Sequence, residues 1–181
     1  MFQHFVLVGV VFSLIIAPLA LRRVPRRPSL SLSQHIAKDD KAIHFAQALF
    51  PVVAGLVVAW YFGWYASTHF TFLLQGLLLV AVCLLAALSG LVPYLEGKRA
   101  GTLHNVFAWT YAYMLPILVM SFFFTSESQL TKVIIGLCGV WQLYGVVLYW
   151  FHTPARRYFL YYQLSYIGAF AVALLATTYI G

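Results

Sequence analysis

The chain has 181 residues, of which 63% are hydrophobic and only 8% are charged, and its formal net charge is +7. A soluble domain of average composition is roughly 45–50% apolar and about 25% charged, so this chain carries too little charge to cover a surface in water. The hydrophobicity also excludes an intrinsically disordered chain, and a mean hydropathy of +0.89 indicates a protein that crosses a membrane several times.

Six apolar segments are each about 20 residues long, the length that a helix needs to cross a bilayer. These segments are 3–21, 44–66, 71–93, 104–124, 132–151 and 158–180. Backbone groups in lipid must be satisfied within their own element, which favours helices, and the alternating pattern of a membrane barrel is missing. The sequence therefore predicts an all-α fold, a polytopic transmembrane bundle of six helices that forms a single domain over residues 1–181.

Basic residues gather in the first, third and fifth connections between these segments. They are Arg22, Arg23, Arg26, Arg27, Lys38, Lys41, Lys98, Arg99, Arg156 and Arg157. The other side has Lys132 alone. By the positive-inside rule, we expect a multi-pass protein of the cell's inner (plasma) membrane, with cytoplasmic basic loops and both termini outside. This arrangement explains the positive charge without nucleic acid, and it makes the lipid bilayer, anionic lipids included, the expected partner.

The first connection, at about 22–43, is expected to hold a short helix before the second apolar segment. Pro25, Pro28 and the stretch Ser31-Leu-Ser-Gln34 argue against a simple helix at its start, whereas Ser33, Asp39 and Asp40 each have the side chain of a helix N-cap.

The second apolar segment contains two further patterns. Gly55, Ala59 and Gly63 recur every four residues and predict a stripe for close helix packing, with assembly into a homo-oligomer or a larger membrane complex as the alternative. Trp60 and Tyr65, near its end, are expected to belong to an aromatic belt at the membrane surface.

Polar side chains within the apolar segments fall mostly in the half next to the basic connections. Such side chains at membrane depth usually face the interior of a bundle or a water-filled cavity. We therefore predict a polar chamber that opens toward the basic side and binds a ligand. Its candidate binding residues are His44, Gln47, His104, Asn105, Tyr111, Tyr149, His152, Arg156 and Arg157.

Three functions fit such a chamber. It could bind or handle a small hydrophobic or lipid-like molecule, with arginines meeting a phosphate or carboxylate, or else the protein is an accessory membrane subunit. Alternatively, His44 and His104 could be the axial ligands of haem b in an electron-transfer protein. Thirdly, His104, Glu96 and either Asp39 or Asp40 could hold a metal or perform acid–base chemistry. Four acidic residues, none inside an apolar segment, favour a non-enzymatic role.

A short motif runs from the end of the third apolar segment to the start of the fourth. Gly90-Leu-Val-Pro93 ends one helix, a loop follows, and Leu103-His104 opens the next. This arrangement resembles a bacterial family of six-helix membrane proteins filed as a domain of unknown function, DUF 998, and the segment Ser31–Ala37 looks like the serine-containing stretch of that family's first loop. The resemblance implies a six-helix membrane architecture over nearly the whole chain. It implies Gly90, Pro93 and His104 as motif positions, and no known activity.

Overall fold

The computed structural model describes residues 1–21, 28–69 and 71–180, and these residues contain helices and no strand. Most of them belong to long helices, so the predicted all-α fold is confirmed. The long helices are α1 (Phe5–Leu21), α3 (Asp40–Trp60), α5 (Leu73–Leu91), α6 (Arg99–Thr125), α7 (Gln129–Phe151) and α8 (Phe159–Tyr179). The short elements are η1 (Phe2–His4), α2 (Leu32–Ile36), the π-helical turn η2 (Tyr61–Tyr65), α4 (Ala66–Thr68) and η3 (Thr153–Tyr158).

Each predicted apolar segment overlaps one of the long helices. Within the described residues, five helices are long and apolar enough to cross a membrane. They are Asp40–Thr68, Leu73–Leu91, Arg99–Thr125, Gln129–Phe151 and Arg156–Tyr179, while Phe2–Ile15 is a shorter apolar helix.

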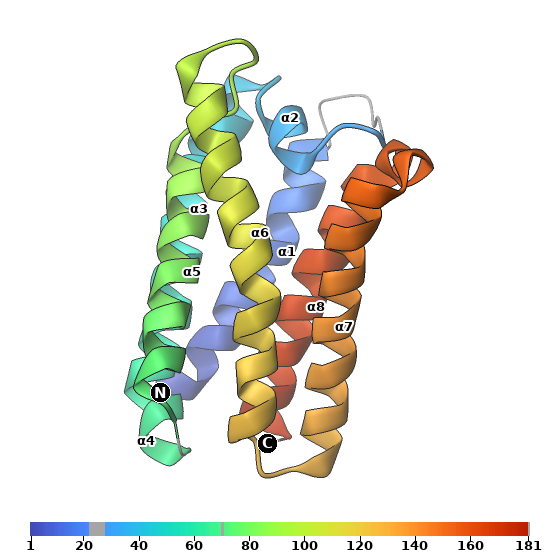
Figure 1. Ribbon diagram of the computed structural model, residues 1–181. Helices are drawn as coiled ribbons and strands as arrows, with labels where there is room; N and C mark the ends of the chain where they lie inside the picture. The colour runs from blue at the N-terminus through green and yellow to red at the C-terminus, as the bar shows by residue number, and fades with distance from the viewer. Residues whose placement is uncertain (22–27, 70, 181) are drawn as a thin grey trace.

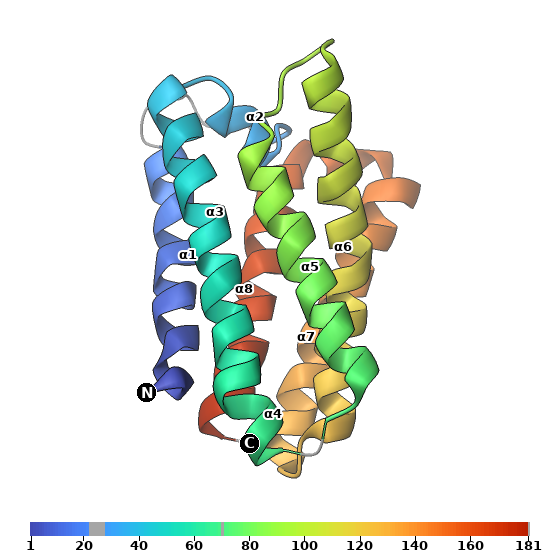
Figure 2. The ribbon, with the colours of Figure 1, turned by 90° about the vertical axis from the view of Figure 1, so that its left-hand side faces the viewer.

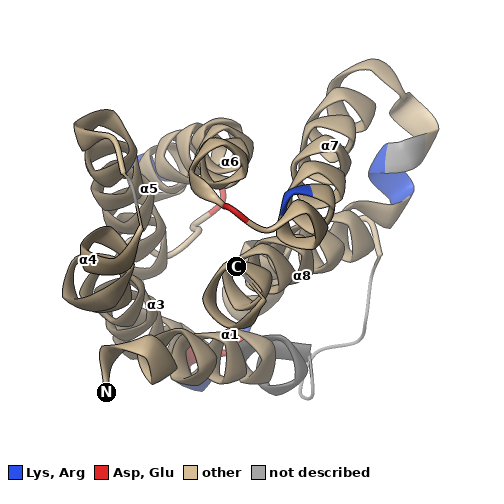
Figure 3. Cartoon of the chain, turned by 90° about the horizontal axis from the view of Figure 1, so that it is seen from below, with Lys and Arg blue, Asp and Glu red and all other residues tan. Residues whose placement is uncertain are grey.

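The long helices form a closed ring. Each packs against its neighbour in the chain, in the order α1, α3, α5, α6, α7, α8, and α1 then closes the ring against α8 (Figures 1 and 2). The view along the bundle shows the same arrangement, with α8 also reaching α6 across the ring (Figure 3). A ring of this kind leaves an interior that several helices share, which is the geometry that a central cavity needs.

The two ends of the bundle differ in what they carry. We call one the α2 end, which holds α2, the connection from α5 to α6, and η3; the other is the α4 end, which holds α4, the connection from α6 to α7, and both chain termini (Figure 1). The described basic residues from the predicted cytoplasmic connections lie at the α2 end: Lys38, Lys41, Lys98, Arg99, Arg156 and Arg157. Lys132 lies in the first turn of α7, at the α4 end. Arg22, Arg23, Arg26 and Arg27 lie outside the described residues.

The helix α2 begins at a side-chain cap that its sequence encodes. The Ser31 hydroxyl accepts from the Gln34 backbone N–H at 3.1 Å, and the Gln34 side-chain oxygen accepts from the Ser31 N–H at 2.7 Å. Ser31, rather than the predicted Ser33, is thus the N-cap, because only Ser31 has a glutamine three residues later to complete the capping box. The expectation that the stretch Ser31-Leu-Ser-Gln34 argues against a helix is therefore wrong, since this stretch starts one. The predicted cap at Asp39 is confirmed, since its carboxylate accepts from the Lys41 N–H at 2.9 Å.

Two hydrogen bonds hold the segment around α2 against α8. The Leu32 N–H donates to the side-chain oxygen of Gln163 at 2.7 Å, and the Leu160 N–H donates to the Pro28 carbonyl at 2.9 Å. Leu32 and Ile36 also bury their side chains against α3 and α8. This short helix is therefore packed into the α2 end of the ring (Figure 1).

For the second apolar segment, the prediction of a surface aromatic belt is wrong, and the prediction of a packing stripe holds at Gly63 but not at Gly55. Trp60 and Tyr65 are both 0% exposed, so they belong to the core and not to a surface belt. The π-helical turn η2 follows directly after Trp60, and its wider winding accompanies the inward placement of both rings. Gly55 has no neighbouring atom within 4 Å of where a Cβ would stand, so the predicted packing stripe has no contact there, whereas Gly63 faces the Phe2 ring.

A polar network lies in the core near the α4 end, where the sequence had indicated few polar contacts. Gln75 is its centre: its oxygen accepts from the Tyr61 hydroxyl at 3.2 Å, and its amide donates to Ser121 at 3.1 Å and to Thr125 at 3.2 Å. The Tyr65 hydroxyl meets the Thr125 hydroxyl at 2.7 Å. The network joins α5, α6 and η2 through side chains that all sit inside the ring.

Candidate functional site

A cavity of about 580 Å³ lies inside the ring at the α2 end. Small-molecule sites in proteins range from roughly 300 to 1,000 Å³, so this cavity is large enough for a ligand. Its walls come from α2, α3, α5, α6, α7, η3 and α8. The cavity lies between the two apolar clusters of the molecule: Leu32 and Ala46 come from the smaller cluster, and Tyr166 packs against the larger one.

Most of the predicted binding residues line this one cavity. They are His104, Asn105, Tyr111, Tyr149, Arg156 and Arg157. Asn105, Arg156 and Arg157 are exposed, whereas His104 is 6% exposed. The cavity therefore has a polar, solvent-facing rim at the α2 end, as expected for a chamber that opens toward the basic side.

The predicted convergence of His44, Gln47 and His152 on the same cavity is wrong. Ile43, Ala46 and Phe50 present the cavity-lining face of α3, and His44 lies one residue from Ile43, which is about 100° around the helix. His44 is exposed as a result, and Gln47 instead donates to the Leu91 carbonyl at 3.0 Å.

His152 follows the last residue of α7 and is exposed. The helix ends before this residue, so the helical face that carries Gly145 and Tyr149 into the cavity does not continue to His152.

His104 is held in place by residues at the end of α5 and in the connection from α5 to α6. Its Nδ1 is 2.8 Å from the Val92 carbonyl oxygen, at the end of α5, and its ring meets the Tyr94 ring edge-on with centroids 5.9 Å apart. A carbonyl can only accept, so Nδ1 is the protonated nitrogen. This leaves Nε2 as the atom through which His104 can contact a molecule in the cavity.

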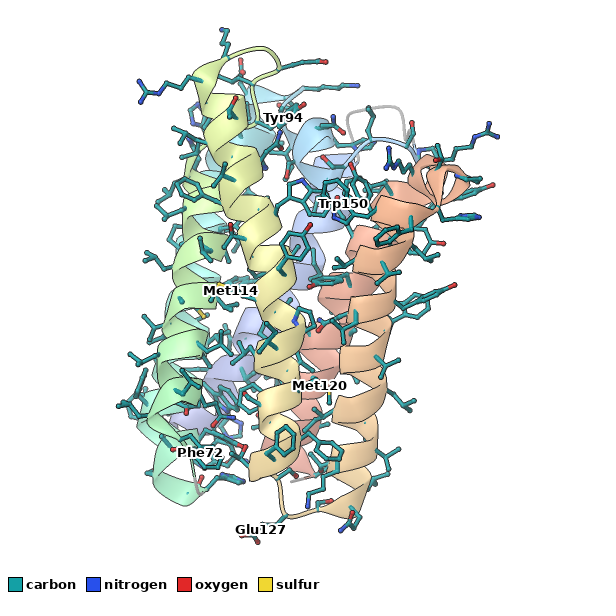
Figure 4. All side chains as sticks on the ribbon, in the orientation of Figure 1. Phe72, Tyr94, Met114, Met120, Glu127 and Trp150 are labelled. Atoms are coloured by element: carbon teal, nitrogen blue, oxygen red, sulfur yellow. The ribbon has the colours of Figure 1, made fainter. Side chains whose placement is uncertain are left out.

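An aromatic wall closes one side of the cavity. The Trp109 ring lies 4.7 Å from Tyr149 and 6.3 Å from Phe159, measured between centroids, and Tyr149 lies 4.5 Å from Phe159. These side chains come from α6, α7 and α8 and hold the three helices together at this level. Tyr94 and Trp150 both lie toward this end of the bundle, whereas Phe72 and Glu127 lie toward the α4 end (Figure 4).

The two arginines at the rim differ in how they are held. Arg156 donates from Nε to the Tyr149 carbonyl at 2.9 Å and from Nη2 to the Trp150 carbonyl at 3.3 Å, and its Cζ lies 5.3 Å from the centre of the Tyr149 ring. These carbonyls belong to the last turn of α7, where a cation is favourable. Arg157 has no such bond to another described residue.

Further polar residues line the cavity beside the candidate binding residues. Ser31, Ser33 and Gln34 come from the segment of α2 and escaped the sequence prediction, whereas Gln163 and Tyr166 of α8 are among the polar side chains that the sequence places next to the basic connections. The Tyr166 hydroxyl donates to the Ala112 carbonyl of α6. The capping box of α2 is visible in the sequence, but its insertion into the ring depends on the contact between Leu32 and Gln163 and has no local signal.

The described residues present no arrangement of side chains that matches the metal or the haem alternative. Among the described residues, no group of three or more histidine, cysteine or acidic side chains is placed to hold a metal ion. His44 and His104 do not share a cavity, so the structure does not present them as a pair of axial ligands.

No protein-family model, no curated protein and no solved structure matches this chain. The resemblance to the six-helix family of unknown function therefore stays a prediction, and the site has to be interpreted from its own geometry.

Proposed function

We propose that the chain is an integral membrane protein of six transmembrane helices that binds a small lipid-like molecule, without catalysing a reaction, in the cavity at its α2 end. The observation that carries this proposal is the cavity itself, because it combines a polar rim with apolar and aromatic walls and lies within the ring. Such a combination suits a molecule with a polar head and an apolar body.

The outer surface supports membrane insertion. Large apolar side chains face outward on α5 and α7, among them Leu73 at 82% exposed, Leu74 at 75% and Leu137 at 68%. Monomeric soluble proteins rarely expose contiguous apolar patches of more than a few hundred Å², whereas side chains of this kind are at home in lipid. The bilayer is therefore the natural surrounding of this ring.

The distribution of charge supports one orientation. The described basic residues concentrate at the α2 end, and only Lys132 belongs to the α4 end, which favours an α2 end in the cytoplasm of a plasma-membrane protein and both termini outside. The test is side-specific labelling of single cysteines placed at Lys98 and Glu127. Labelling of both positions from the same side would overturn the orientation and the six-span topology together.

The binding function is tested by filling the cavity. Ala108 lines it, so Ala108→Phe should occupy the space that a ligand needs, while Ala48→Phe makes the same change on the exposed face of α3. Each variant is purified in neutral detergent, and co-purified lipid-like molecules are quantified by mass spectrometry. We expect Ala48→Phe to retain the bound molecule and Ala108→Phe to lose it. Equal retention, or no bound molecule in the unaltered protein, would refute the proposed function.

A further inference from the structure

The rim of the cavity carries positive charge that the described residues do not neutralise. Of the described side chains that line the cavity, two are arginines and none is acidic. The acidic residues of the same end, Asp39, Asp40 and Glu96, do not line it. A molecule that enters here therefore meets guanidinium groups without a competing carboxylate.

Arg156 and Arg157 divide two tasks between them. Arg156 donates two hydrogen bonds to carbonyls at the end of α7, and its guanidinium group lies over the Tyr149 ring. Its position is therefore set before a ligand arrives. Arg157 donates no hydrogen bond to another described residue, and its planar group matches the paired oxygens of a phosphate or carboxylate. A fixed cation next to an available one is an arrangement that favours an anion.

The wall contributed by α3, together with Ile167 of α8, is different in character. Ile43, Ala46, Phe50 and Ile167 line the cavity there, and all four side chains are apolar. Ala46 is buried and the other three are half-buried. A molecule that fills the space between this wall and the arginines needs a charged end and an apolar end.

We propose that the ligand is an anionic amphiphile, whose phosphate or carboxylate headgroup lies at Arg157 and Arg156 and whose apolar chain lies against Ile43, Phe50 and Ile167. This inference rests on the proposed function, because it names the chemical class of the molecule that the cavity binds.

The experiment measures the binding of three probes to the full chain in a neutral detergent by native mass spectrometry. The probes are dioctanoyl phosphatidic acid, dioctanoylglycerol, which lacks the phosphate, and inorganic phosphate, which lacks the chains. We expect the first to bind at least tenfold more tightly than either of the others. Arg157→Gln should weaken its binding about tenfold, equivalent to ~1.4 kcal/mol. Arg99→Gln removes the same charge from the same end but not from the cavity, and should change binding less than twofold.

Each outcome is informative. Equal binding of dioctanoylglycerol and dioctanoyl phosphatidic acid overturns the anionic headgroup and leaves the proposed function standing. Binding of inorganic phosphate as tight as that of the lipid overturns the apolar chain. Equal losses in Arg157→Gln and Arg99→Gln show general attraction to the basic end and overturn the placement at the cavity. If no probe binds, the proposed function fails as well. Should Arg157→Gln not fold, Ala108→Phe replaces it, and retained binding of the anionic lipid in that variant overturns the inference.

Discussion

The polar network around Gln75 allows a quantitative test of how the ring is held together. In the membrane that we propose as the surroundings of this chain, helices have no hydrophobic drive to associate, so packing and polar contacts between them provide the stability. Gln75 is 2% exposed and makes one hydrogen bond to Tyr61 in η2 and two to residues of α6, Ser121 and Thr125. Gln75→Leu keeps a side chain of similar size and removes all of these bonds.

The expected loss follows from the number of bonds. Hydrogen bonds between membrane helices contribute about 0.6 kcal/mol each on average, so the three bonds of Gln75 correspond to about 2 kcal/mol of unfolding free energy. Gln47→Leu is the matched control: Gln47 is half-buried and makes one bond, to the Leu91 carbonyl, so its loss should not exceed about 0.6 kcal/mol.

The assay is reversible unfolding in mixed micelles by sodium dodecyl sulfate, followed through tryptophan fluorescence. A double-mutant cycle with Thr125→Val isolates the bond between Gln75 and Thr125, and we expect a coupling of about 0.6 kcal/mol. If Gln75→Leu is as stable as the unaltered protein, or if the coupling is zero, the network does not hold α5 against α6 and the reasoning is wrong.

Two further substitutions test the connection from α5 to α6. A Cβ at Gly101 would collide with the Leu95 carbonyl oxygen, which is backbone and cannot turn aside, so Gly101→Ala should lower the unfolding free energy by about 1–3 kcal/mol. Gly55→Ala, made in open space, should change it by no more than about 1 kcal/mol, and equal effects in the same unfolding assay would contradict the structure here. His104→Phe leaves the Val92 carbonyl without its donor and should cost about 1–3 kcal/mol. An unchanged midpoint for this variant would show that the bond contributes nothing.

The site shows where prediction from the sequence succeeds. His104 and Tyr111 lie seven residues apart on one face of α6, with Asn105 beside that face, and the structure places all three on the cavity. Arg156 and Arg157 follow from their place in a basic connection next to polar residues of α7. In each case a local pattern, either helix spacing or chain proximity, was enough to bring the residues to the same end of the bundle.

His44 shows where such prediction fails. Helices that are apolar nearly all round have no strong amphipathic face that would tell which side turns inward. A shift of one residue moves a side chain about 100° around the helix, which is the difference between His44, outside the cavity, and Ile43, on its wall. The prediction that Trp60 and Tyr65 belong to a surface belt is wrong for a related reason. Proximity to a helix end predicts that a side chain lies near the membrane surface, but it does not predict whether the ring points outward or into the core.

What the sequence alone determined is the set of long apolar helices, the concentration of cations at one end and the presence of polar groups near them, because length, composition and spacing are local properties. Closure of the ring between α1 and α8, the insertion of α2 and the cavity at the α2 end are decided by the tertiary structure. These features depend on shape and on contacts between residues far apart in the chain, and no local pattern in an apolar helix specifies them.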